Sequence, residues 1–371
     1  MCVSTGLKQV LLPLFRPLIS SLPHFATPLN DIRDLQETLT LYETKHSFYL
    51  TAQHIGQSEL VLAAAYHFSK VCPLTHLFFA LDAALLLARI YLLQRQNAPN
   101  SFLKAAFLCF SPFTIFGQGL LNIGTLNDLL FTLQAIAGYS CHLGESALLG
   151  AVLSYTDPRT CFLLWPMQVL AARNANQKVF KSLVVQAGLV VAVWACVGSE
   201  SQVLNAYNIL MVNNTTENIG TFWYLNLEMF KTRLAFLKTT MLLVQAFMCV
   251  LIAMHLHKTY DALSMAYPAP QPRRRRNLYL NGVLILSLVK LVMNQYPCLD
   301  DLSTCAFFVV LNLSFVTKNV GALMLFLCGT ACCATNSAFL WVTWLRRFSG
   351  NANFFYFQTL ATFAFCVLFF I

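Results

Sequence analysis

The stretch "FFALDAALLLARIYLL", residues 78–93, decides the fold class of this chain. Its only charged residues are Asp82 and Arg89, and the rest is almost entirely apolar. Together with the apolar residues beside it, the stretch is long enough to cross a hydrocarbon core about 30 Å thick. It predicts a helix that spans a membrane.

The composition of the whole chain leads to the same class. The chain has 371 residues, of which 57% are hydrophobic and 11% are charged, and its mean hydropathy is +0.61. A soluble domain carries about 25% charged residues, so this chain has too few to cover its surface in water. Its apolar runs have the length of membrane helices, and the alternation of short barrel strands is not seen. We therefore predict an all-α, polytopic helical membrane protein.

Eleven apolar spans are predicted, or twelve if the weaker segment 8–21 anchors the N-terminus. No soluble domain and no internal repeat is seen, so residues 1–371 are predicted to form a single multi-pass membrane domain. The eleven spans lie near residues 74–94, 101–118, 122–140, 143–157, 158–172, 182–200, 232–255, 278–295, 303–317, 319–345 and 354–371.

The loops predict the orientation of the chain. Basic residues accumulate in cytoplasmic loops, which places the basic loops 173–181 and 256–277 in the cytoplasm. Loop 201–231 then faces the lumen, where the sequons at Asn213 and Asn214 would be glycosylated. The first luminal loop is 22–73. The net charge of +9 is explained by these loops, or by binding of acidic lipid headgroups, and does not indicate nucleic acid.

Polar residues inside the spans have two interpretations. A carboxylate at the centre of a membrane helix costs about 2.5–3.5 kcal/mol. Asp82 is therefore expected to be neutral, paired, or close to the lumen, either in a contact between helices or in contact with a substrate or ion. Asn127 and Asp128 begin another span and are expected to cap it.

The segment "NIGTFWYLNLEMF", residues 218–230, is too short and polar to cross a bilayer. As a helix it places Trp223, Leu227 and Phe230 on one face, with Tyr224 and Glu228 on another. Because Trp and Tyr favour the membrane interface, we expect the helix to lie along the luminal surface. It either anchors the chain there or shapes a groove for the head of an amphiphile.

Signals for catalysis are weak. Phosphate-binding loops, zinc-protease helices and nucleophile elbows are absent from the sequence. The first luminal loop offers Asp31, Asp34 and Glu37 but no Asp-x-Asp motif, which leaves a glycosyltransferase as the alternative. The 13 Cys do not show the spacing of a metal or redox site, so neither a metal nor a cofactor is expected.

Four segments resemble those of a known family and follow one another in the same order as in that family. They are the span around Asp82, "ENIGTFWYLNLEMF" (217–230), "NQYPCLDDL" (294–302) and "SGNANFFYFQTL" (349–360). With them, the chain resembles the PIG-U subunit of the glycosylphosphatidylinositol (GPI) transamidase. The family is related to the mannosyltransferases of GPI synthesis, which implies a glycosyltransferase-C-like topology.

The resemblance also implies a function. It implies a non-catalytic subunit in the endoplasmic reticulum membrane that helps bind the GPI glycolipid, beside a caspase-like catalytic subunit and other partners. The alternative is a GPI mannosyltransferase that uses dolichol-phosphate-mannose and carboxylates of the first luminal loop.

The same resemblance implies which residues bind lipid. Asn351 and Asn353 match asparagines that contact GPI, and His257 falls near a family lysine. Lys178 and Lys181 stand where the family has a basic loop for acidic lipid. The remaining GPI-binding candidates belong to the matching motifs: Phe222, Trp223, Glu228, Phe230 and Phe354.

Overall fold

In the computed structural model, the chain forms a bundle of helices. The structure describes residues 32–45, 58–96, 104–105, 124–197, 206, 220, 222–228, 231–266, 272–294, 297, 299–312, 328–329, 332, 336–337, 339–349 and 351–368. Over these residues the regular secondary structure is helical and contains no strand. The prediction of an all-α helical membrane protein is confirmed.

The helices follow the predicted spans closely. They are α2 (Ile32–Lys45), α4 (Glu59–Ser69), α5 (Leu74–Arg95), α8 (Gly124–Tyr139), α9 (Leu143–Thr156), η1 (Pro158–Thr160), α10 (Cys161–Asn174), α11 (Val179–Val197), α13 (Phe222–Glu228), η2 (Lys231–Arg233), α14 (Leu234–Ala266), α15 (Pro272–Met293), α16 (Leu299–Leu311), the π-helical turn η3 (Val342–Arg346) and α19 (Ala352–Leu368).

Three helices are long and apolar enough to cross a membrane. They are α5, α11 and residues 234–262 of α14. Other predicted spans correspond to shorter helices, such as α9 and α10 with 14 residues each. The predicted spans 101–118 and 319–345 lie largely outside the described residues, so the number of eleven or twelve spans stays a prediction.

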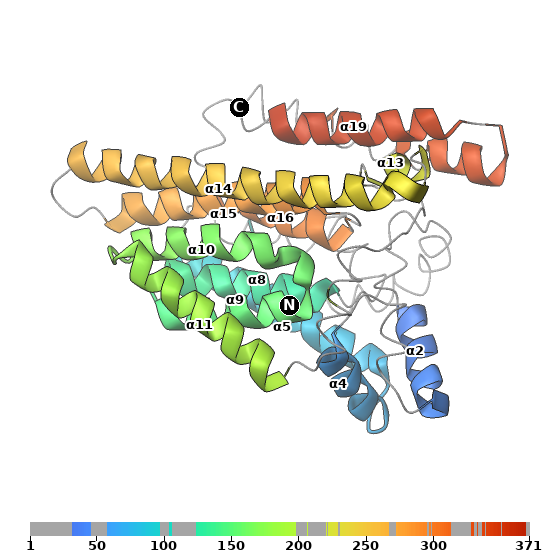
Figure 1. Cartoon of the computed structure of the whole chain (residues 1–371), viewed down its shortest axis with the longest axis horizontal. Coiled ribbons are helices and arrows are strands. Elements are labelled where there is room, and N and C mark those ends of the chain that lie inside the picture. The colour runs from blue at the N-terminus through green and yellow to red at the C-terminus, as the bar shows by residue number, and fades with distance from the viewer. Residues whose placement is uncertain are drawn as a thin grey trace.

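The bundle has two distinct ends (Figure 1). At the right of Figure 1, α13 lies beside the beginnings of α14 and α19, and we call this the α13 end. At the left, α10 and α14 end and α11 and α15 begin. This opposite end carries Arg173, Arg275 and Arg276, and we call it the arginine end. The described helices of the predicted luminal segments, among them α2 and α13, lie toward the α13 end.

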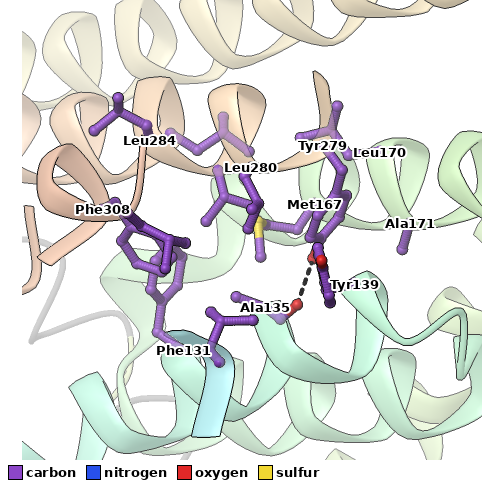
Figure 2. Close-up of a cluster of buried hydrophobic side chains, with 14 of the residues drawn as sticks. Phe131, Ala135, Tyr139, Met167, Leu170, Ala171, Tyr279, Leu280, Leu284 and Phe308 are labelled. Carbon is purple, nitrogen blue, oxygen red and sulfur yellow. Dashed lines mark hydrogen bonds between the residues drawn. The ribbon is translucent and has the colours of Figure 1, made fainter. Parts of the chain in front are cut away.

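The core lies where α8, α10, α15 and α16 meet, as Figure 2 shows. Phe131 and Phe308 meet edge to face, with their ring centroids 6.0 Å apart. The Tyr279 hydroxyl donates a hydrogen bond of 3.1 Å to the carbonyl oxygen of Ala135. This approach requires Gly138, because a Cβ there would lie 2.2 Å from that hydroxyl. A small residue in α8 thus allows a tyrosine of α15 to satisfy its polar group inside the core.

The predicted first luminal loop, 22–73, contains the short helices α2 and α4 within its described residues. Helices α2 and α4 form a small apolar cluster with the start of α5, in which Leu62 is fully buried. Tyr42 and Tyr66 meet edge to face on its border. The cluster joins α2 and α4 to the bundle at the point where α5 begins.

The stretch 267–276, rich in proline and then in arginine, predicts an extended linker, and this prediction is wrong for residues 272–276, which are helical. Helix α14 continues to Ala266, and α15 already begins at Pro272, which includes the arginine run 273–276. Proline suits the first turn of a helix because its φ is preset and its missing N–H has no helical partner there. The Tyr260 hydroxyl also donates to the carbonyl oxygen of Arg275 at 3.1 Å, which ties the two helices together.

Candidate functional site

Helix α13 packs against protein through an aromatic cluster at the α13 end. Trp223 is only 1% exposed and stacks on Trp344, with ring centroids 5.8 Å apart. Its ring also lies 5.7 Å from that of Phe355, which is fully buried in α19. Trp341 completes the cluster. The predicted interfacial helix is therefore more than an anchor, since its largest ring joins α13 to η3 and α19.

Tyr224, the next residue, makes a second connection to α19. Its ring stacks on that of Tyr356 at 4.3 Å with an angle of 17° between the planes. Its hydroxyl donates a hydrogen bond to Oδ1 of Asn353. A stacked ring and a polar tip together fix the direction in which the Tyr224 hydroxyl points.

The two asparagines lie at the beginning of α19. Asn351 occupies the cap position, and its Oδ1 accepts a 3.1 Å hydrogen bond from the backbone N–H of Asn353. Asparagine is among the best residues for this role because its oxygen satisfies a backbone donor that has no partner within the helix. With both amide oxygens accepting bonds from the protein, the amide nitrogens remain to meet a ligand. Both residues are exposed.

Glu228 lies one helical turn after Tyr224 on the same face of α13. Desolvation raises the pKa of the Tyr224 hydroxyl, and the Glu228 carboxylate raises it further by its charge and by a hydrogen bond to the same hydroxyl. The hydroxyl therefore keeps its proton at neutral pH and remains a donor. Glu228 itself is exposed and adds a negative charge beside the asparagine amides.

The structure brings together most of the predicted GPI-binding residues at this end. Trp223, Glu228, Asn351 and Asn353 belong to the α13–α19 contact. Phe222, which precedes Trp223 in α13, is buried. Phe354, which follows Asn353 in α19, is 64% exposed. Three predicted residues lie outside the described ones: Phe230, Asn213 and Asn214.

His257 lies elsewhere. It follows the start of α14 by 23 residues, or about 35 Å of helix, and sits at the arginine end. Arg173 Nε donates to its Nδ1 at 2.6 Å, and Arg173 Nη1 lies 3.1 Å from Oδ1 of Asp261. The structure therefore separates His257 from the asparagines. Lys178 and Lys181 are exposed at the same arginine end. Lys178 lies in the connection from α10 to α11, and Lys181 lies in the first turn of α11.

An apolar groove of about 430 Å³ runs between α10 and α14. His257 lines the groove at the arginine end, and the other lining residues are almost all apolar, among them Trp165, Val169, Val250 and Met254. An apolar groove with a polar end is complementary to an amphiphile, which has an apolar chain and a polar head.

A second polar group lies inside the bundle toward the α13 end. Lys290 Nζ contacts Oδ1 of Asp128 at 2.8 Å and Oδ1 of Asp301 at 2.9 Å, and all three side chains are buried. The prediction that Asp128 caps its helix is therefore wrong. Helix α8 begins at Gly124, so Asp128 lies inside it and faces a lysine of α15.

Asp82 belongs to the same buried group. It lies on α5 with Arg89, whose guanidinium donates to the hydroxyls of Ser303 (2.9 Å) and Thr304 (2.8 Å). Asp300 accepts a long hydrogen bond of 3.5 Å from Thr125. The buried-charge cluster, as we call it, thus joins four helices and contains four carboxyl groups and two cations: Asp82, Asp128, Asp300, Asp301, Arg89 and Lys290.

The sequence contained a signal for this cluster that reasoning from single residues missed. Lys290 lies inside an apolar span, and Asp300 and Asp301 begin the next one. Charged side chains at such positions face the interior of the bundle and pair with one another. Over the described residues, no three His, Cys, Asp or Glu side chains converge as metal ligands would.

Comparison with known protein families identifies the chain. A family model described as GPI transamidase subunit PIG-U matches residues 3–362, nearly the full length. The chain belongs to the PIG-U family. No curated protein matches the chain in a sequence search. Family membership implies a subunit role in the GPI transamidase and in the attachment of GPI anchors.

Proposed function

We propose that this chain is a non-catalytic subunit of the GPI transamidase that holds the GPI glycolipid for transfer to protein C-termini. The head of the glycolipid binds at the α13 end, beside Asn351 and Asn353. The catalytic thiol belongs to a caspase-like partner subunit, and the complex resides in the endoplasmic reticulum membrane. The lipid chains of GPI lie along the apolar surface of the helices.

The contact between α13 and α19 carries this proposal. Tyr224 and Asn353 are 129 positions apart in the chain, yet they share a hydrogen bond. Each lies in one of the segments that resemble the family. The contact forms a small site with amide donors and one carboxylate above buried aromatic rings. Such a site suits a ligand whose head is polar and whose tails are apolar.

The exposed apolar side chains around the site support a lipid ligand. Phe354 and Phe357 of α19 are 64% and 69% exposed, and Leu227 of α13 is 47% exposed. In a membrane these side chains contact hydrocarbon at little cost. At the start of α19, the amides would therefore contact the polar head of a glycolipid, and the phenyl rings would contact its lipid chains.

The arginine end has a separate role in this proposal. Lys178 and Lys181 are exposed and close to the predicted cytoplasmic surface, where acidic phospholipids attract basic side chains by about 1 kcal/mol each. We propose that they contact acidic phospholipid there. His257, at the end of the groove between α10 and α14, would contact lipid rather than the GPI head.

The experiment is purification of the tagged complex in mild detergent, followed by mass spectrometry of its proteins and lipids. We expect a caspase-like protease and GPI to be recovered with the wild-type chain. The double variant Asn351→Ala, Asn353→Ala should recover the same proteins with at least about fivefold less GPI. The variant Asn97→Ala, Asn100→Ala removes two amides from the short connection between the predicted spans 74–94 and 101–118 and is the matched control.

Other outcomes would decide against the proposal. Equal GPI recovery with the asparagine variant would show that these residues do not hold the ligand. Recovery of the chain without a protease, together with mannose transfer from dolichol-phosphate-mannose, would establish the alternative enzyme. In that case Asp31→Ala, Asp34→Ala and Glu37→Ala should abolish transfer, whereas they should spare GPI recovery if the proposal is right.

A further inference from the structure

We infer that a buried water site lies between α8, α9, α10 and α11, about two helical turns from the arginine end, and that its water bridges α11 to the bundle. The site is defined by the side-chain amide of Gln186 in α11. It is separate from the α13–α19 contact, so the inference goes beyond the proposed function and does not depend on it. The groups that meet there are neutral amides and hydroxyls, which water satisfies as both donor and acceptor.

The face of α11 that meets the bundle is the first observation. Of the 19 residues of α11, all of which the structure describes, only Ser182 and Gln186 are buried. The two residues are one helical turn apart, so they lie on the same face. Large apolar side chains of the same helix, such as Phe180 and Val191, are 80% and 68% exposed. The deepest part of the contact between α11 and its neighbours is therefore polar, as is common between helices in a membrane.

Ser182 lies at the outer level of this contact and is bonded directly. Nε2 of Gln168 in α10 donates to the Ser182 hydroxyl at 2.7 Å and to the carbonyl oxygen of Leu143 at 3.3 Å. Oε1 of Gln168, however, has no hydrogen-bond partner among the described residues, and neither has the hydroxyl of Ser146 in α9. Both side chains are 0% exposed. Direct contacts therefore satisfy only part of the polar groups at this level.

One turn further along α11, the unsatisfied groups are more numerous. Gln186 is 0% exposed, and within the described part of the chain neither its amide oxygen nor its amide nitrogen has a hydrogen-bond partner. The same holds for Nε2 of Gln134 in α8, which is 1% exposed. Buried amides in native proteins are almost always hydrogen-bonded, to ordered water where no protein group is in reach.

Gly150 of α9 brings two of these amides to one point. A Cβ at Gly150 would lie 2.6 Å from Nε2 of Gln134 and 3.2 Å from Nε2 of Gln186. The two amides therefore face the same place on α9, where no side chain stands between them. A buried water molecule needs two to four polar partners, and the amides from α8 and α11 supply them.

The site lies close to the aqueous phase although it is buried. Gln186 follows the start of α11 by seven residues, Gly150 follows the start of α9 by seven, and Gln134 precedes the end of α8 by five. At 1.5 Å per residue, these positions lie about 8–10 Å from the arginine end. Water at this depth is only a short distance from the predicted cytoplasmic surface.

A direct bond between the amides of Gln134 and Gln186 is the competing arrangement. Turning one amide over would place an oxygen against a nitrogen. It would still leave the second polar atom of Gln186 without a partner, and with it Oε1 of Gln168 and the hydroxyl of Ser146. Water can bond to all of these groups, because each molecule donates two hydrogen bonds and accepts two.

The test of the site is a high-resolution cryo-electron microscopy map of the purified wild-type complex. We expect a separate density peak at about 3 Å from the side-chain amide of Gln186, within the same distance of Gln134, Gln168 or Ser146. An amide of Gln186 that bonds directly to a protein group, with no density beside it, would overturn the inference. This measurement needs no variant and therefore does not depend on the folding of one.

Gln186→Leu tests whether the water holds α11. The substitution keeps a similar side-chain size but removes both polar atoms, so the water loses its partners in α11. Backbone hydrogen exchange in the first half of α11 should become about tenfold faster. Gln177→Leu is the matched control, because it removes an exposed amide at the same end of the bundle. It should change this exchange by less than about twofold.

The two measurements decide different parts of the inference. Density at Gln186 together with faster exchange in the Gln186→Leu variant supports both the site and its role. Density with unchanged exchange in that variant would overturn the role of the water in holding α11. Neither result bears on the proposed function, which is decided by the recovery of GPI with the asparagine variant.

Discussion

The buried-charge cluster and the α13–α19 contact join helices in opposite ways. The first holds α5, α8, α15 and α16 by ion pairs and hydrogen bonds at buried positions. The second holds two helices by stacked rings and one hydrogen bond at the border of the protein. The charged side chains of the first region are buried, and the second presents exposed amides and phenyl rings. The comparison predicts that the first region contributes most to stability and, under the proposed function, that the second binds the ligand.

Lys290→Met should have the largest effect on folding. It removes the cation between Asp128 and Asp301 and leaves two buried carboxylates without their counter-charge, which costs about 3–5 kcal/mol. We expect a strong drop in the yield of folded protein and in its thermal midpoint in detergent. Lys258→Met, at an exposed position of the arginine end, is the control and should change neither.

A normal midpoint for Lys290→Met would break the comparison, because the buried-charge cluster would then contribute little to stability. The double variant Lys290→Met, Asp128→Leu tests the same point from the other side. Replacing both partners by apolar residues of similar size should recover part of the loss, since fewer charges remain buried without a partner.

Gly138→Ala should have the next largest effect. Its Cβ would lie 2.2 Å from the Tyr279 hydroxyl and 2.8 Å from the ring carbon that carries it, so the tyrosine must move and lose its bond to Ala135. Overpacking of this kind costs about 1–3 kcal/mol. Gly144→Ala is the control, because nothing lies within 4 Å of the added atom. Equal midpoints for the two variants would contradict the close packing of α8 and α15.

Asp300→Asn should have a smaller effect that depends on pH. Asp300 lies in the predicted luminal connection before the span that begins at 303. Burial raises its pKa well above the ordinary value, and Asp128 and Asp301 raise it further. Because the folded state then favours the protonated acid, the contribution of Asp300 to stability is present at low pH and is lost as the pH rises through its folded pKa.

Asparagine resembles the protonated acid but does not titrate. The midpoint of the Asp300→Asn variant should therefore exceed that of the wild type at about pH 8 and approach it at about pH 5. Thermal unfolding in detergent at both values measures the difference. A variant less stable than the wild type at the higher pH would mean that the charged carboxylate stabilises the cluster.

Trp223→Ala should have the smallest effect on the bundle. The ring joins α13 to η3 and α19, and none of the four helices of the buried-charge cluster contributes to this aromatic cluster. Hydrogen exchange should rise in α13 and at the start of α19, while exchange in α8 and α15 stays unchanged. Binding of GPI should fall. Faster exchange throughout the bundle would show that the two regions are not separate.

The sequence predicted the helices well because the signal for them is local. A run of apolar residues with the length of a membrane determines a helix almost independently of its neighbours, and α5 agrees with the prediction within one residue. The basic loop was predicted less well. Proline followed by four arginines indicates an extended linker when it is considered alone. In the structure the arginines belong to α15, and the Tyr260 hydroxyl of α14 donates a hydrogen bond to the carbonyl oxygen of Arg275. This contact between two helices cannot be read from the local sequence.

The site was predictable in part. The family resemblance selected the segments around Trp223 and Asn353, and the structure brings them together. The hydrogen bond from Tyr224 was not predictable, because it depends on the rotation of α13 relative to α19. The partner of Asp128 was also not predictable, since Lys290 lies 162 positions away in the chain. Pairing across that separation is decided by packing and not by spacing.

Helix α14 has 33 residues and is therefore about 50 Å long, whereas a hydrocarbon core is about 30 Å thick. Unless it tilts steeply, several turns extend beyond the lipid chains into the aqueous phase at the arginine end. The helix thus reaches from the α13 end to His257, Lys258 and Asp261, which lie beyond the lipid chains at the arginine end.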